Sequence, residues 1–164
     1  MIIRGASALL LGATLAVGLL TSARAAVAFS CLVSATSIVF GVYNPLNTAP
    51  TQSSGTWTVT CTATGSGSAT VSGTLSLSTG LSGSFFPRKM VAGANTLAYN
   101  VYTSATDAQI MGDGTGGTSL LSQSGTVSSG QQYVISATMY GNLPPLQDVA
   151  PGSYFDSLIL TVAY

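Results

Sequence analysis

Hydrophobic and polar residues alternate along most of this chain, and the alternation predicts β-strands. Residues 56–62 (TWTVTCT) place Trp57, Val59 and Cys61 on one face and threonines on the other, and residues 69–79 repeat this pattern with valine and leucine. Further runs of β-branched and aromatic residues predict strands over 31–43, 97–103, 131–140 and 154–164. Loops rich in glycine, serine and proline separate them, at 44–55, 80–94, 107–117 and 141–152. This spacing predicts an all-β protein, an antiparallel β-sandwich of one domain.

The first 25 residues follow a different pattern. Arg4 gives a positive start, an apolar stretch follows, and small residues at Ala23 and Ala25 close it. That order is typical of a secretory signal peptide, and the stretch is short for a membrane-spanning helix. We expect cleavage after Ala25, or after Ala28 where the small-residue pattern recurs, which leaves a domain over 26–164. Since no second segment is long and apolar enough to insert into a membrane, we expect a secreted protein.

Charged residues are few. The sequence has four basic and four acidic residues and no histidine, and the expected mature domain keeps Arg88 and Lys89. Without clustered cations it is not expected to bind nucleic acid or anionic lipid. Acid–base catalysis usually needs a histidine or an activated carboxylate, and the aspartates are interpreted as turn or strand-edge residues. We therefore predict that the protein is not an enzyme and holds no metal or cofactor. These aspartates are Asp107, Asp113, Asp148 and Asp156.

Two cysteines, Cys31 and Cys61, complete the residues with distinctive chemistry. An even number of cysteines in an exported chain predicts one disulfide, which here would join the first predicted strand to the second. Closing a loop of about 30 residues would stabilise the fold by roughly 3.5–4 kcal/mol on the chain-entropy model. A metal or redox pair is a weaker interpretation, because a metal site needs more ligands and the chain has no Cys-x-x-Cys.

Several short motifs occur in a fixed order along the chain. After Cys31 come residues 40–43 (FGVY), and the second cysteine follows in Val59-Thr60-Cys61. Residues 88–90 (RKM), 97–102 (LAYNVY) and 112–114 (GDG) come next, and the sequence closes with 152–157 (GSYFDS) and 160–164 (LTVAY). Together these motifs cover nearly all of the expected mature chain. The ordered set resembles the spore coat protein U domain, which is also the subunit fold of archaic chaperone–usher pili.

The resemblance implies an immunoglobulin-like sandwich that lacks its last strand and is completed by a donated strand. A periplasmic pilus chaperone would lend that strand, and after delivery to an outer-membrane usher a neighbouring fibre subunit would replace it. Leu158, Leu160, Val162 and Tyr164 share one face of the last predicted strand. They would line the acceptor groove and contact the chaperone.

We therefore predict a structural subunit of a surface fibre or coat that serves adhesion or biofilm formation. Only residues 26–30 precede Cys31 after the expected cleavage, which is short for a donor strand and suggests a tip-like or minor subunit. The alternative is a self-complete secreted module that binds a surface or a carbohydrate. Its contact residues would be Phe85 and Phe86 in their loop, or Trp57, although Trp57 shares a face with Cys61 and is expected in the core.

Overall fold

Residues 28–163, which the computed structural model describes, form eight β-strands and one short 3-10 turn. The predicted signal peptide and Tyr164 lie outside these residues. Across the described residues, no helix has the length and apolar character needed to cross a membrane. The elements are β1 (Ala28–Ala35), β2 (Thr51–Thr64), β3 (Ser68–Leu77), the turn η1 (Gly80–Ser82), β4 (Arg88–Ala92), β5 (Asn95–Tyr102), β6 (Leu121–Ser128), β7 (Gln132–Leu143) and β8 (Leu160–Ala163).

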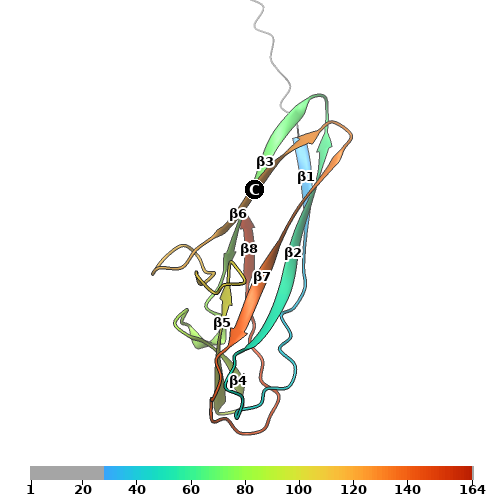
Figure 1. The fold of residues 1–164 in the computed structure, drawn as a ribbon. Coiled ribbons are helices and arrows are strands. Elements are labelled where there is room, and N and C mark those ends of the chain that lie inside the picture. The colour runs from blue at the N-terminus through green and yellow to red at the C-terminus, as the bar shows by residue number, and fades with distance from the viewer. Residues whose placement is uncertain (1–27, 164) are drawn as a thin grey trace, which may run out of the picture.

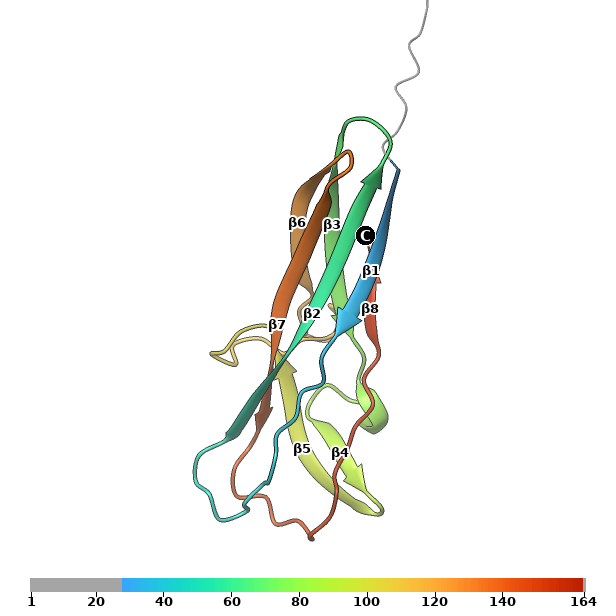
Figure 2. The same cartoon turned by 90° about the vertical axis from the view of Figure 1, so that its right-hand side faces the viewer.

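The strands form two antiparallel sheets that face each other, as Figures 1 and 2 show. One sheet has five strands in the order β1-β2-β7-β5-β4, and the other has three in the order β6-β3-β8. The prediction of an all-β antiparallel sandwich is therefore confirmed. Its longest pairing joins β2 to β7 over twelve partner pairs, from Thr51 opposite Leu143 to Thr62 opposite Gln132.

The strand order is that of an immunoglobulin-type sandwich with one position open. A constant-type immunoglobulin domain has strands A-B-E-D in one sheet and C-F-G in the other. Here β1-β2-β7-β5 take the A-B-E-D positions, and β3 and β8 take the C and F positions. The strands β4 and β6 are additions at the outer edges of the two sheets. Within the described residues, no strand occupies the G position beside β8.

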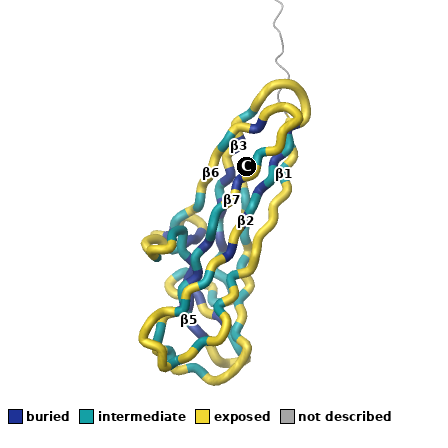
Figure 3. Tube along the Cα trace, turned by 45° about the vertical axis from the view of Figure 1, so that its right-hand side comes forward, coloured by how far each residue is buried: buried dark blue, intermediate teal, exposed yellow. Residues whose placement is uncertain are grey.

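The core lies between the sheets and follows from the alternation of the strands (Figure 3). On β2 the inward residues Trp57, Val59 and Cys61 are fully buried, so the predicted core position of Trp57 is confirmed. On β3 the inward Val71 and Leu75 are buried as well. Serines and threonines take the alternate, outward positions of these strands. Each sheet therefore has an apolar inner face and an outer face rich in hydroxyl groups.

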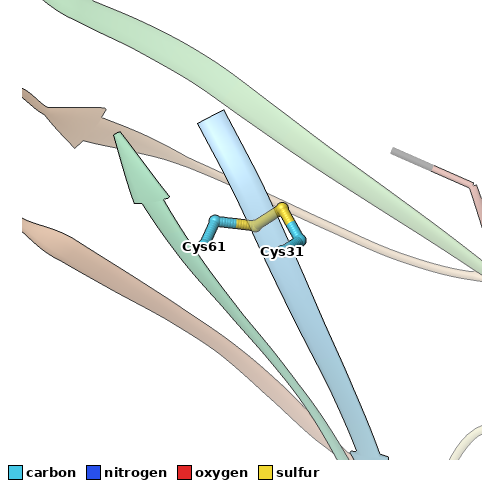
Figure 4. The surroundings of a disulfide bond; sticks show 2 residues. All are labelled: Cys31 and Cys61. Carbon is cyan, nitrogen blue, oxygen red and sulfur yellow. A yellow bond between two sulfur atoms is a disulfide. The ribbon is translucent and has the colours of Figure 1, made fainter. Parts of the chain in front are cut away.

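The predicted disulfide is present and joins β1 to β2, as Figure 4 shows. Cys31 and Cys61 are direct partners in the antiparallel register, and their Cα atoms lie 4.1 Å apart. Because Cys61 is buried on the inner face of the sheet, the bond also fixes which face of β1 points inward.

Several strand boundaries differ from those predicted. The first strand ends at Ala35, and residues 36–43 continue as an irregular segment instead of a strand. Strands β4 and β6 were not predicted. The last strand begins only at Leu160, because the main chain of residues 154–159 pairs with a strand only in an isolated bridge between Phe155 and Val91.

Candidate functional site

A long groove of about 1060 Å³ opens between the two sheets on the side of β1 and β8. One wall is the segment after β1, residues 35–43, and the other is the segment that leads into β8, residues 149–158 with Leu160. Figure 2 shows both segments on one side of the molecule. Apolar side chains from both sheets form the floor: Leu77, Met90, Leu97, Tyr99, Val101, Met139 and Leu143.

Inward side chains along this side of the sandwich remain partly exposed. Val33 lies on the same face of β1 as Cys31 and opposite the fully buried Val59, yet 39% of its surface is exposed. Leu160 and Val162 on β8 lie opposite the buried Leu77 and Leu75, but they are only half-buried. The alternation of these strands is thus the pattern of a buried interior, but within residues 28–163 no segment fully covers these side chains.

Two glycines position the first wall. A Cβ atom on Gly141 of β7 would lie 2.7 Å from side-chain carbons of Ile38 and Phe40. A Cβ atom on Gly55 of β2 would lie 2.7 Å from the carbonyl oxygen of Thr36. The bare backbone at these points lets the segment after β1 cross directly over the β2–β7 pair. The Phe40 ring then packs edge to face on Tyr99, with centroids 6.0 Å apart.

The lower end of this wall is joined to the loop after β7. The Tyr43 hydroxyl donates to the carbonyl of Pro144 (3.0 Å) and accepts from the backbone N–H of Gln147 (2.8 Å). The Gln147 side chain in turn accepts from the N–H of Ala98 (2.8 Å) and donates to its carbonyl (2.9 Å). One side chain thereby satisfies both backbone groups of Ala98 on β5, in a stretch of that strand that does not pair with β7.

The second wall is anchored by Asp156. Its carboxylate accepts hydrogen bonds from the backbone N–H groups of Leu81 and Ser157 and from the Tyr99 hydroxyl, each at 2.7 Å. Burial, and then the hydrogen bond to Asp156, raise the pKa of Tyr99 well above its ordinary value. Gly80 adopts a φ of +71°, and any Cβ there would collide with this carboxylate. Asp156 therefore attaches the segment before β8 to η1 and β5.

A buried arginine supports the floor from behind. Arg88 is fully buried, and its guanidinium donates to the carbonyl of Ser78 from Nε (2.9 Å) and Nη2 (2.8 Å). It also donates to the carbonyl of Met111 (2.8 Å) and to Oδ1 of Asn100 (2.8 Å). The ring of Phe85 lies 4.8 Å from its Cζ atom. Burial lowers the pKa of Arg88. These bonds connect β4 and β5 to the end of β3, next to Leu77 and Met90 of the floor.

The predicted acceptor residues occupy this region in part. Leu158 and Leu160 line the groove, and Val162 continues the same face of β8 beyond it. Tyr164, the fourth predicted acceptor residue, lies outside the described residues. The opposite wall at 36–43 and the support by Arg88 were not predicted as parts of the site. The sequence carried one signal for each, because the wall includes the motif at 40–43 and Arg88 begins the motif at 88–90.

The other candidate positions are dispersed. Phe85 is half-buried against Arg88, whereas Phe86 is 55% exposed beside Lys89, so their predicted role in surface contact stays a prediction.

The Asp113 carboxylate accepts from the backbone and hydroxyl of Thr115, and these bonds lower its pKa. Asp107 accepts from the Asn142 side chain. Residues 28–163 contain no group of three or more His, Cys, Asp or Glu side chains placed to hold a metal ion.

The fold and groove define a class: a two-sheet, immunoglobulin-type sandwich with an open apolar groove at one pair of edges. The profile of the Spore Coat Protein U domain matches residues 16–161, and the chain belongs to this family. The family is named for a structural protein of the spore coat, which agrees with the prediction that the chain is not an enzyme.

The chain is also similar to a chain in a solved structure from Acinetobacter baumannii. That structure is the crystal structure of the CsuC–CsuE chaperone–tip adhesion subunit pre-assembly complex from archaic chaperone–usher Csu pili. The sequences are 18% identical and the TM-score is 0.49. The match covers 84% of this chain but only 40% of the other. No curated protein matches the sequence.

Proposed function

We propose that this protein is a strand-accepting structural subunit of an extracellular surface fibre or coat. The observation that carries the proposal is the groove beside β8, whose apolar floor lies between the outer strands β1 and β8 of the two sheets. An extended strand placed there would pair with the main chain and place alternate side chains on the floor. It would occupy the G position of the immunoglobulin-type order and complete the sandwich.

The donor would be a periplasmic chaperone first and a neighbouring subunit after delivery to an outer-membrane usher, as the family resemblance implies. The predicted signal peptide would bring the chain to that compartment, and the disulfide fits an oxidising one. If the signal is cut after Ala25, few residues precede Ala28, where β1 already begins. A mature chain of this kind would accept a strand without donating one, as expected of a tip-like or minor subunit.

Adhesion is a second role that one observation favours. Phe86 and Leu81 are both more than half exposed and line a shallow depression with Lys89. Exposed apolar side chains that neighbour one another suit contact with a surface or with a carbohydrate ring. Replacing Phe86 by serine would lower attachment to such a surface and leave the groove intact. Equal attachment by the variant and the parent would remove Phe86 from this role.

The main proposal is tested by producing the full precursor in a bacterial periplasm with and without a pilus chaperone. Size-exclusion chromatography of the soluble fraction then reports the stoichiometry. A soluble one-to-one complex that is absent without the chaperone supports strand acceptance. A stable monomer produced equally well alone shows that the fold is self-complete, and the secreted binding module then becomes the function.

A further inference from the structure

A second open strand edge lies on the other side of the molecule. In the three-stranded sheet β8 is one outer strand and β6 the other, and no strand of the described residues pairs with the outer edge of β6. Figure 2 shows β6 on the side away from β1 and β8. β6 pairs with β3 without interruption from Leu121 opposite Leu75 to Ser128 opposite Ser68. It is therefore a regular edge strand of eight residues.

Charge, proline and a bulge, three of the usual protections of an edge strand, are absent from β6. Natural edges carry charged residues, prolines or bulges, or they are covered by another segment. The sequence of β6 (LSQSGTVS) has no charge and no proline, and its register with β3 has no bulge. Besides its bonds to β3 and the turn after it, β6 takes part in one hydrogen bond in residues 28–163, from the Tyr133 hydroxyl to the carbonyl of Ser124 (3.3 Å).

The outer edge of β4, unlike that of β6, has two of these protections. Its Val91 exchanges two backbone hydrogen bonds with Phe155, at 2.8 and 3.1 Å, so that edge is partly covered. β4 also carries Arg88 and Lys89, the only charged residues in the eight described strands. The four aspartates of the described residues all lie in loops. No charged side chain on β6 itself therefore opposes the approach of two β6 edges.

We infer that β6 is a self-association edge, through which two copies of this chain join their three-stranded sheets side by side. The occupant is a second copy because an open, uncharged antiparallel edge is complementary to itself in a two-fold pair. With Ser124 facing Ser124 of the second copy, Ser122 lies opposite Thr126, so outward hydroxyl side chains pair only with one another. The product is a continuous six-stranded sheet with an uncharged outer face rich in serine and threonine.

This association is independent of the groove, because β6 and β8 are opposite edges of the same sheet. A fibre or coat subunit whose groove is filled would still present β6. The contact of a single strand pair is small compared with a standard interface of about 1,600 Å². It is therefore weak between two isolated copies, and it strengthens when many copies are arrayed in one assembly. Its consequence would be lateral attachment between assembled fibres or within a coat.

The test compares Ser124→Lys with Ser72→Lys. Both serines are exposed on the same sheet face and are direct partners, Ser124 on the edge strand and Ser72 one strand further in. In the paired sheet the two lysines at 124 would lie about 5 Å apart. The two lysines at 72 would be separated by three strand spacings, roughly 14 Å, which exceeds the Debye length of about 8 Å at physiological ionic strength.

Sedimentation velocity over a concentration series would be measured on the protein as purified from the periplasm, with its chaperone bound if it needs one. The parent is expected to sediment faster with rising concentration, Ser72→Lys to behave alike, and Ser124→Lys to lose this dependence. Thr126→Lys, also exposed on β6, should behave like Ser72→Lys, because in this register its two lysines would lie four residues apart along the paired strands, roughly 14 Å. A parent that stays monodisperse, or lysine variants that all behave alike, would overturn the inference. Neither result depends on whether the chaperone was required, so a failure here is distinct from a failure of the strand-accepting function.

Discussion

Replacing Arg88 by methionine tests whether the buried guanidinium supports the groove floor. The change would remove the donors that bind the carbonyls of Ser78 and Met111, and it would leave the Oδ1 atom of Asn100 with only the backbone N–H of Val101. A buried acceptor left without a partner costs about 1–3 kcal/mol, and the burial of the cation itself is relieved in return. The expected net loss in the free energy of unfolding is about 3–5 kcal/mol, or roughly 6–20 °C in melting temperature.

The assay is thermal and guanidinium unfolding of the purified, oxidised protein. Arg88→Lys should lose less than the methionine variant, because an ammonium retains the charge but cannot reproduce the planar fork of donors. Lys89→Met removes the neighbouring exposed cation and should change stability by no more than about 0.5 kcal/mol. A methionine variant at position 88 as stable as the parent would refute the reasoning, since the three acceptors would then have no need of Arg88.

Three further changes test other parts of the structure. Replacing Cys31 and Cys61 by alanine should lower the free energy of unfolding by roughly 3.5–4 kcal/mol, and a loss below about 1 kcal/mol in guanidinium unfolding would contradict this. Gly141→Val should displace the first groove wall and reduce the yield of chaperone complex. Gly73→Ala is the control, because its Cβ would have no neighbour closer than 3.8 Å and should leave the yield unchanged. Equal yields from the two variants would contradict a role for this wall in binding the chaperone. Tyr99→Phe should cost about 1.5–3 kcal/mol at neutral pH. Because the pKa of Tyr99 is raised in the folded state, the stabilisation is complete below the unfolded pKa of about 10 and is lost as pH rises above it. The phenylalanine variant should therefore lose less stability with rising alkaline pH, by up to about 1.4 kcal/mol per pH unit, and parallel pH curves would contradict the raised pKa.

The elements that alternate clearly could be predicted from the sequence. The pattern at 56–62 placed Trp57 and Cys61 in the core, and both are fully buried. β6 (LSQSGTVS) could not be found in this way, because its alternation is weak. Its outer face is rich in hydroxyl groups, but its inner face carries a glycine and a glutamine besides two aliphatic residues. β4 is short and begins with two cations, which is typical of a loop in isolation.

The site was predictable on one side only. The spacing of Leu158, Leu160 and Val162 predicts one face of a strand, and the described structure places all three on the inner side of the sandwich. The other wall depends on Gly55 and Gly141, which lie far along the chain from the segment they accommodate. The burial of Arg88 likewise depends on distant backbone carbonyls, which carry no signal in the side-chain pattern.

Hydrogen–deuterium exchange tests strand acceptance most directly. The backbone amides of the complex with a pilus chaperone would be compared, peptide by peptide, with those of the same protein after the chaperone has been dissociated from it. We expect new protection along the two walls of the groove and the strands that adjoin them, residues 31–43 and 149–163, with little change along β6. Protection that falls elsewhere, or a complex that leaves both walls exchanging as before, would contradict the claim that a partner strand fills this groove.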